Sequence, residues 1–183
     1  MLAVAFALAF GVGAAASLIS ERGSGFLLGE EGSPRAATQE EASPEMDKES
    51  YAAVVGGVQN GAVEVLTDSN DKLLRYDSLT AADVDDLEAN YLALGKYSDQ
   101  AEGLEPPEGY EDQHEIFSAA VRELHDAAGV AHRLVANPVS ATKADFDEYE
   151  RHVDTATASL RESNEILDQN YKTTEGLSRP GAL

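Results

Sequence analysis

Apolar residues recur at intervals of three and four along most of the chain between residues 45 and 172. This interval places side chains on one face of an α-helix, and almost no stretch shows the alternation of a half-buried β-strand. The pattern therefore predicts an all-α fold. The expected helices span about residues 45–76, 80–103, 110–136 and 142–171.

Each predicted helix has a distinct set of inward apolar positions. On the first, these are Tyr51, Val54, Val58, Ala62, Val65, Leu66 and Leu73. On the second, they are Val84, Leu87, Tyr91, Leu94 and Ala101. On the third, they are Phe117, Val121, Leu124, Ala128, Leu134 and Val135. On the fourth, they are Phe146, Tyr149, Val153, Ala156, Leu160 and Leu167.

Local signals set the helix ends. Thr80-x-x-Asp83 and Thr142-x-x-Asp145 resemble capping boxes, in which a threonine and an acidic residue satisfy the first free amides of a helix. Pro106-Pro107 and Asn137-Pro138 each stop the helix that precedes them. Connections of roughly 3–8 residues favour antiparallel neighbours, so we expect an up-down-up-down four-helix bundle with tight, coiled-coil-like packing.

The first predicted helix contains three glycines, Gly56, Gly57 and Gly61. Each costs up to about 1 kcal/mol relative to alanine in a helix interior. Two interpretations stay open from sequence: the glycines allow a neighbouring element to approach closely, or they break the helix.

Residues 2–19 form an apolar run with no charged side chain. Bulky residues up to Val12 followed by Ala14-Ala15-Ala16 are typical of a signal peptide cleaved after Ala16, and an uncleaved membrane anchor is the alternative. No basic residue precedes Arg22, so either translation starts upstream of Met1 or only the amino terminus supplies the usual charge. A buried core helix is disfavoured because the run has no polar face.

Two segments flank the predicted bundle, which spans residues 45–172. Residues 20–44 are rich in Gly, Ser, Glu, Ala and Pro and predict a flexible acidic linker. Residues 173–183 have a similar composition and predict a disordered tail.

The chain is strongly acidic and has no cysteine. With 34 acidic and 13 basic residues its net charge is −21, which disfavours binding to nucleic acid or to anionic lipid headgroups. We therefore expect membrane contact only through residues 2–19, if these are uncleaved. The lack of cysteine excludes disulfides, thiolate metal sites and lipid attachment through a lipobox.

Histidine supplies the one candidate chemistry. His114, His125 and His132 lie on one face of the third predicted helix, but roughly 16 and 10 Å of axial rise separate them, so they cannot share one ion. The best pairing brings His125 or His132 near His152 and Glu148 of the next helix, as ligands for a divalent transition metal. The alternative is that all of these are ordinary residues at the edge of the core.

Other catalytic patterns are incomplete. Glu111-x-x-His114 matches half of a di-iron motif, but no second copy exists. The sequence also has no Gly-x-Ser-x-Gly, no His-Glu-x-x-His and no Gly-rich phosphate loop. We therefore expect a protein that is not an enzyme and has no cofactor.

Leu104-Glu105-Pro106-Pro107, followed by His114, Phe117, Ala120 and Leu124, resembles a helical hairpin of uncharacterised exported bacterial and archaeal proteins. A looser likeness is to the extracytoplasmic four-helix sensory bundles of membrane receptors. The resemblance to the helical hairpin covers about 40 residues. It implies an exported helical domain and transfers no catalytic residue.

These observations together predict a non-enzymatic extracytoplasmic domain, secreted or anchored at the cell envelope. Its expected role is a binding or structural module, with an unknown protein or envelope component as partner. The alternative function is a helical bundle that captures or senses metal.

Overall fold

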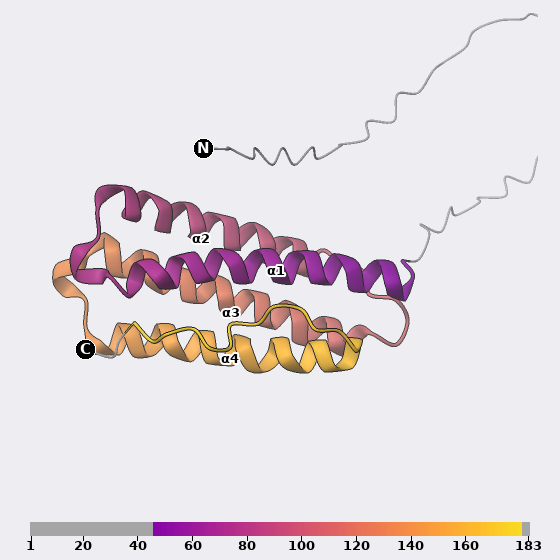
Figure 1. Ribbon diagram of the computed structural model, residues 1–183. Coiled ribbons are helices and arrows are strands. Elements are labelled where there is room, and N and C mark those ends of the chain that lie inside the picture. Colours follow the sequence, from indigo (N-terminus) through magenta and orange to yellow (C-terminus); the bar gives the residue numbers. More distant parts are fainter. Residues whose placement is uncertain (1–45, 181–183) are drawn as a thin grey trace, which may run out of the picture. The chain divides into compact units, whose positions relative to one another are not determined.

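The computed structural model describes residues 46–180, and these residues form four α-helices and no strand. The helices are α1 (Lys48–Leu73), α2 (Ala81–Glu102), α3 (Glu111–Ala136) and α4 (Lys143–Leu167), with short 3-10 turns at Tyr76–Ser78 and Pro138–Ser140. Consecutive helices run in opposite directions (Figure 1). The all-α prediction is confirmed for this part of the chain. The predicted signal or anchor at residues 1–19 and the linker at 20–44 lie outside it.

None of the helices between residues 46 and 180 combines the length and apolar composition that a bilayer crossing requires.

Capping boxes begin α2 and α4 at the two predicted threonines. The Asp83 carboxylate accepts a hydrogen bond from the Thr80 amide at 2.8 Å, and the Thr80 hydroxyl accepts one from the Asp83 amide at 3.2 Å. The Thr142 amide donates to Asp145 at 2.8 Å. Hydrogen bonds from the threonine hydroxyl and amide hold the pKa of each aspartate below its ordinary value.

Replacing Thr80 with alanine is expected to lower the free energy of unfolding by about 1 kcal/mol, because the Asp83 amide then loses its partner. Urea denaturation measures this loss. Thr155→Ala is the matched control, since Thr155 is exposed inside α4, where alanine is a better helix former. Equal losses in the two variants would contradict the capping role.

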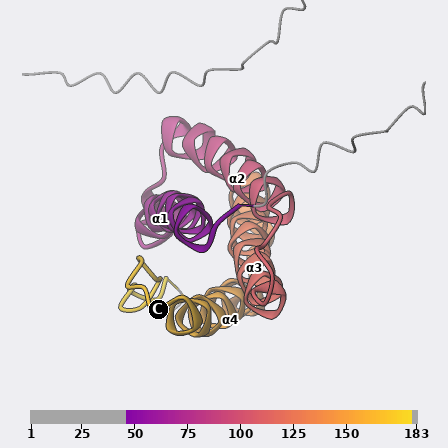
Figure 2. The same ribbon diagram turned by 90° about the vertical axis from the view of Figure 1, so that its right-hand side faces the viewer.

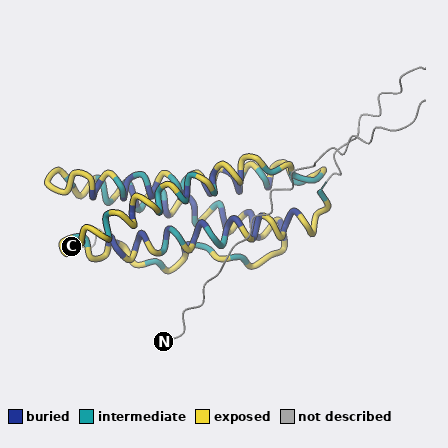
Figure 3. Tube along the Cα trace, turned by 90° about the horizontal axis from the view of Figure 1, so that it is seen from above, coloured by how far each residue is buried: buried dark blue, intermediate teal, exposed yellow. Residues whose placement is uncertain are grey.

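The interior is mostly hydrocarbon, and α3 contributes most to it. All six predicted inward residues of α3 are buried, and α3 packs against α1, α2 and α4. Buried positions line the facing sides of the helices (Figure 3). On α1 the prediction for Val54 was wrong: its side chain is 37% exposed, and Val55 is buried instead. Neighbours surround α1 on most sides, so Val54 falls on the narrow face left to solvent.

The glycines of α1 permit close approach and do not break the helix, which is continuous from Lys48 to Leu73. A Cβ atom at Gly56 would lie 2.5 Å from the ring of Tyr171, and one at Gly61 would overlap the Tyr97 hydroxyl. Gly57 has open space beside it. Two of the three glycines therefore accommodate tyrosine rings from other parts of the fold.

Residues 168–180, here named the C-terminal segment, run back along the bundle between α1 and α4 (Figures 1 and 2). The sequence predicts a disordered tail at residues 173–183. This prediction is wrong for residues 173–180, which pack in this position; Thr174, for example, is 3% exposed. α1 and α4 make few direct contacts with each other, and the segment occupies the space between them. The folded unit therefore extends beyond the predicted boundary at residue 172.

Candidate functional site

Amide side chains line the groove between α1 and α4 and bind the main chain of the C-terminal segment. Gln59 Nε2 donates to the Lys172 carbonyl at 2.8 Å, and Asn60 Oδ1 accepts from the Lys172 amide at 2.9 Å. Further along, Asn70 Nδ2 donates to the Ser178 carbonyl at 3.1 Å. From α4, Asn164 Nδ2 donates to the carbonyl of Tyr171 at 3.1 Å. These contacts satisfy backbone groups that the segment does not pair within itself.

Three side chains of the segment anchor it to the helices. The ring of Tyr171 covers Gly56, and its hydroxyl donates to the Ala52 carbonyl at 2.6 Å. The Thr174 hydroxyl contacts that of Thr157. The two terminal nitrogens of Arg179 bind both carboxylate oxygens of Asp154, at 2.7 and 3.1 Å.

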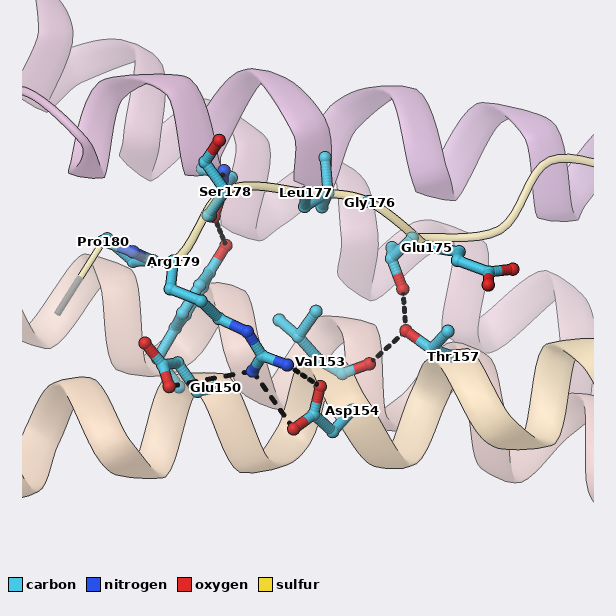
Figure 4. A pocket seen from close by; sticks show the side chains of 13 residues that line it. Glu150, Val153, Asp154, Thr157, Glu175, Gly176, Leu177, Ser178, Arg179 and Pro180 are labelled. Atoms are coloured by element: carbon cyan, nitrogen blue, oxygen red, sulfur yellow. Dashed lines mark hydrogen bonds and ion pairs between the residues drawn. The ribbon is translucent and has the colours of Figure 1, made fainter. Parts of the chain in front are cut away.

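A small cavity of about 160 Å³ lies beside the segment, toward its end. Glu150 and Asp154 of α4 line its acidic side (Figure 4). Arg179, which pairs with Asp154, also forms an ion pair with Glu150 at 3.7 Å. Tyr149 lines the inner side, and burial raises the pKa of its hydroxyl. The cavity therefore combines an acidic rim with a neutral, hydrogen-bonding wall.

A second polar group lies between α3 and α4. Glu123, Asp126 and His152 each offer a possible ligand atom, and these atoms lie within 4.8 Å of one another. His152 Nδ1 is 2.6 Å from Glu123 Oε2, and His152 Nε2 is 3.9 Å from Glu148. Carboxylates and imidazole together suit zinc or copper.

Neighbouring cations compete with a metal ion for the ligands of this candidate metal site. The guanidinium of Arg151 lies 3.2 Å from His152 Nε2, and Arg133 pairs with Glu148 at 3.0 Å. A metal at His152 would have to displace one of these cations or the Glu123 contact.

The structure places the predicted ligands in three separate regions. The rings of His125 and His132 both stack with the ring of Tyr91 of α2, and their centroids lie 4.8 and 5.5 Å from that of Tyr91. His152 and Glu148 lie on α4 beside Glu123. The expected pairing of His125 or His132 with His152 is therefore not formed, because the first two histidines face α2.

His114 belongs to a polar network inside the bundle. Its Nδ1 lies 3.2 Å from the Tyr51 hydroxyl, which donates to Gln113 Oε1 at 2.8 Å; Gln113 in turn donates to Ser163 at 2.8 Å. Burial raises the pKa of Tyr51 to about 12, so this hydroxyl keeps its proton at neutral pH. The network joins α1, α3 and α4, and Gln113 at its centre is buried.

Burial lowers the pKa of His114, so acid is expected to destabilise the fold through this residue. Unfolding restores a pKa near 6.5, and the unfolded chain then binds more protons than the folded chain. The free energy of unfolding should therefore fall as the pH drops from about 6.5 toward the lower folded pKa. Denaturation at several pH values measures this slope. His114→Gln should flatten it, and an unchanged slope would contradict the role of His114.

Comparison with protein-family models, with curated proteins and with solved structures found no match.

Sequence reasoning named Glu148 beside His152 but missed Glu123 and Asp126, and it also missed the amides of the groove. Glu123 and Asp126 lie three residues apart on α3 and so share a face, but the rotation of α3 that turns Glu123 toward His152 is not visible in the sequence. Gln59 and Asn70 are buried polar residues among the mostly apolar buried positions of α1, which was the available signal for a polar neighbour.

Proposed function

We propose that this chain is a non-enzymatic binding module that works outside the cytoplasm, at the cell envelope. The observation that carries the proposal is the groove between α1 and α4, whose amide side chains bind an extended stretch of main chain. The apolar run at residues 2–19 and the acidic composition support an extracytoplasmic location. The proposed partner is a protein or another envelope component.

The proposed architecture is an up-down-up-down four-helix bundle carried by a leader. In this arrangement residues 1–19 act as a signal peptide or an anchor, and residues 20–44 form a flexible spacer. The antiparallel order of the four helices supports the bundle part of this proposal.

Protease treatment of intact cells tests the location. An exported domain should be digested by added protease, whereas full protection until the cells are lysed would overturn the proposal. Mass spectrometry of the mature amino terminus then distinguishes the two forms, because cleavage after Ala16 removes the apolar run and an anchor keeps it.

A second candidate function is metal capture or sensing, favoured by the proximity of Glu123, Asp126 and His152. Calorimetry with zinc and with copper tests it. A metal that binds only the folded state should stabilise that state, by about 2.7 kcal/mol at a concentration 100 times its Kd. His152→Ala should abolish the heat of binding, and His132→Ala, which alters a histidine stacked on Tyr91, is the control.

A further inference from the structure

The groove between α1 and α4 recognises main chain more than side chains. Its amides contact the carbonyl groups of Tyr171, Lys172 and Ser178 and the amide of Lys172. Every extended polypeptide carries these groups at the same spacing. Such contacts supply affinity for an extended chain without requiring a particular sequence.

Selectivity comes from three positions along the segment. Gly56 leaves room for an aromatic ring at position 171, where the hydroxyl reaches the Ala52 carbonyl. Position 174 is buried and suits a small hydroxyl side chain. Position 179 faces two carboxylates, Asp154 and Glu150, and selects a cation. Bidentate pairing with Asp154 favours arginine over lysine.

The present occupant does not use all the hydrogen-bonding capacity of the groove. Among the described residues, Gln59 Oε1 and Asn164 Oδ1 are the buried side-chain atoms without a partner. Gln59 is fully buried and Asn164 is 7% exposed, and the nitrogen of each amide group already donates to the segment. The unpaired oxygens therefore lie at the same interface. A backbone N–H of an extended chain is the donor that such an oxygen accepts.

We propose that this groove is a binding site for an extended peptide that presents tyrosine, threonine and arginine at the spacing of residues 171, 174 and 179. The chain's own C-terminal segment is its intramolecular occupant, and a peptide of the same chemistry displaces it in trans. This inference rests on the proposed function, because it specifies the partner of a binding module.

Two features make the segment displaceable. It forms no helix of its own beyond α4, and side-chain hydrogen bonds from Gln59, Asn70 and Asn164 and the ion pair of Arg179 with Asp154 hold it in place. It also leaves α4 at Asp168, whose φ of 55° is a left-handed conformation that costs energy for a residue with a side chain. Tethering opposes release, because a short linker gives an effective concentration on the order of millimolar.

Cutting the tether after folding tests the proposal in the complete protein. A protease recognition sequence is inserted between Gln169 and Asn170, which are both exposed, and the folded protein is then cleaved. The probe is a fluorescein-labelled synthetic peptide of residues 170–180. We expect the labelled peptide to replace the cleaved segment in a saturable manner while circular dichroism shows that the helices remain.

Matched peptides and variants make the result specific. A probe with glutamate at position 179 should bind at least about tenfold more weakly, because it loses the Asp154 pair and faces two like charges. In the protein, Gly56→Ala should weaken binding by about the same factor, because its Cβ occupies the place of the tyrosine ring. Gly57→Ala should leave binding unchanged, since nothing lies beside that position.

Three outcomes would overturn the inference. These are loss of helix content on release of the segment, retention of the segment without exchange over days, and equal binding of a scrambled peptide. Failure of the proposed location is distinguishable, because cytoplasmic protection from protease changes none of these binding results. Peptide exchange likewise does not depend on whether residues 1–19 are cleaved.

Discussion

Leu124→Ala is expected to lower the free energy of unfolding by about 2–5 kcal/mol. Leu124 is fully buried in the middle of α3, the helix that packs against the other three. Removing its three outer carbons costs the transfer of hydrocarbon to water and leaves a void that rigid neighbouring helices fill only in part. Urea denaturation monitored by circular dichroism measures the loss as a lower midpoint with an unchanged slope.

Leu92→Ala is the matched control for this substitution. Leu92 lies on α2 with 57% of its surface exposed, so the same chemical change should alter stability by about 0.5 kcal/mol or less. Similar losses at both positions would mean that α3 is not the centre of the core.

Gly56→Ala is expected to lower the free energy of unfolding by about 1–3 kcal/mol, although alanine is the better helix former. The added Cβ would lie 2.5 Å from the Tyr171 ring, so the ring must leave the face of α1. The hydrogen bond from the Tyr171 hydroxyl to the Ala52 carbonyl is then lost. Thermal and chemical denaturation measure the loss, and faster amide exchange at Lys172 would show that the segment has been released.

Gly57→Ala separates steric conflict from helix propensity. No atom outside the helix lies within 4 Å of its added Cβ, so this variant should gain up to about 1 kcal/mol. The two glycines are adjacent in one helix and differ in what covers them. Stabilisation of both variants to the same extent would contradict the packing of Tyr171 on Gly56.

The sequence predicted the four helices because apolar residues recur at helical spacing along each of them, and capping boxes or prolines mark several of the ends. The predicted stripe of α3 is buried at every position, and Thr80 and Thr142 begin the two helices for which they were proposed as caps. The error at Val54 has a geometric cause. A periodic stripe assumes one buried face, whereas α1 is covered by two helices and by the C-terminal segment.

The C-terminal segment was not predictable from its own residues. Its composition is typical of disorder, and its order comes from partners more than 100 positions earlier, such as Gln59 and Asn70. Buried amides on α1 indicate a polar neighbour without indicating which part of the chain supplies it. Local patterns therefore could not place residues 173–180.

The contacts of the candidate metal ligands also could not be predicted from the pattern along one helix. The expectation that His125 and His132 share one face agrees with their stacking on one ring, that of Tyr91. Which neighbour that face meets depends on the rotation of α3 within the fold. That rotation turns Glu123 toward α4 instead, where it meets His152.

The position of the C-terminal segment also sets an order for folding. The helices of each antiparallel pair are close in sequence, so α3 with α4 and α2 with α3 can associate rapidly through short loops. Docking Lys172 on Gln59 closes a loop of more than 100 residues and carries the larger entropic cost. The helices should therefore assemble first, and the C-terminal segment should dock between α1 and α4 in a separate, later kinetic phase.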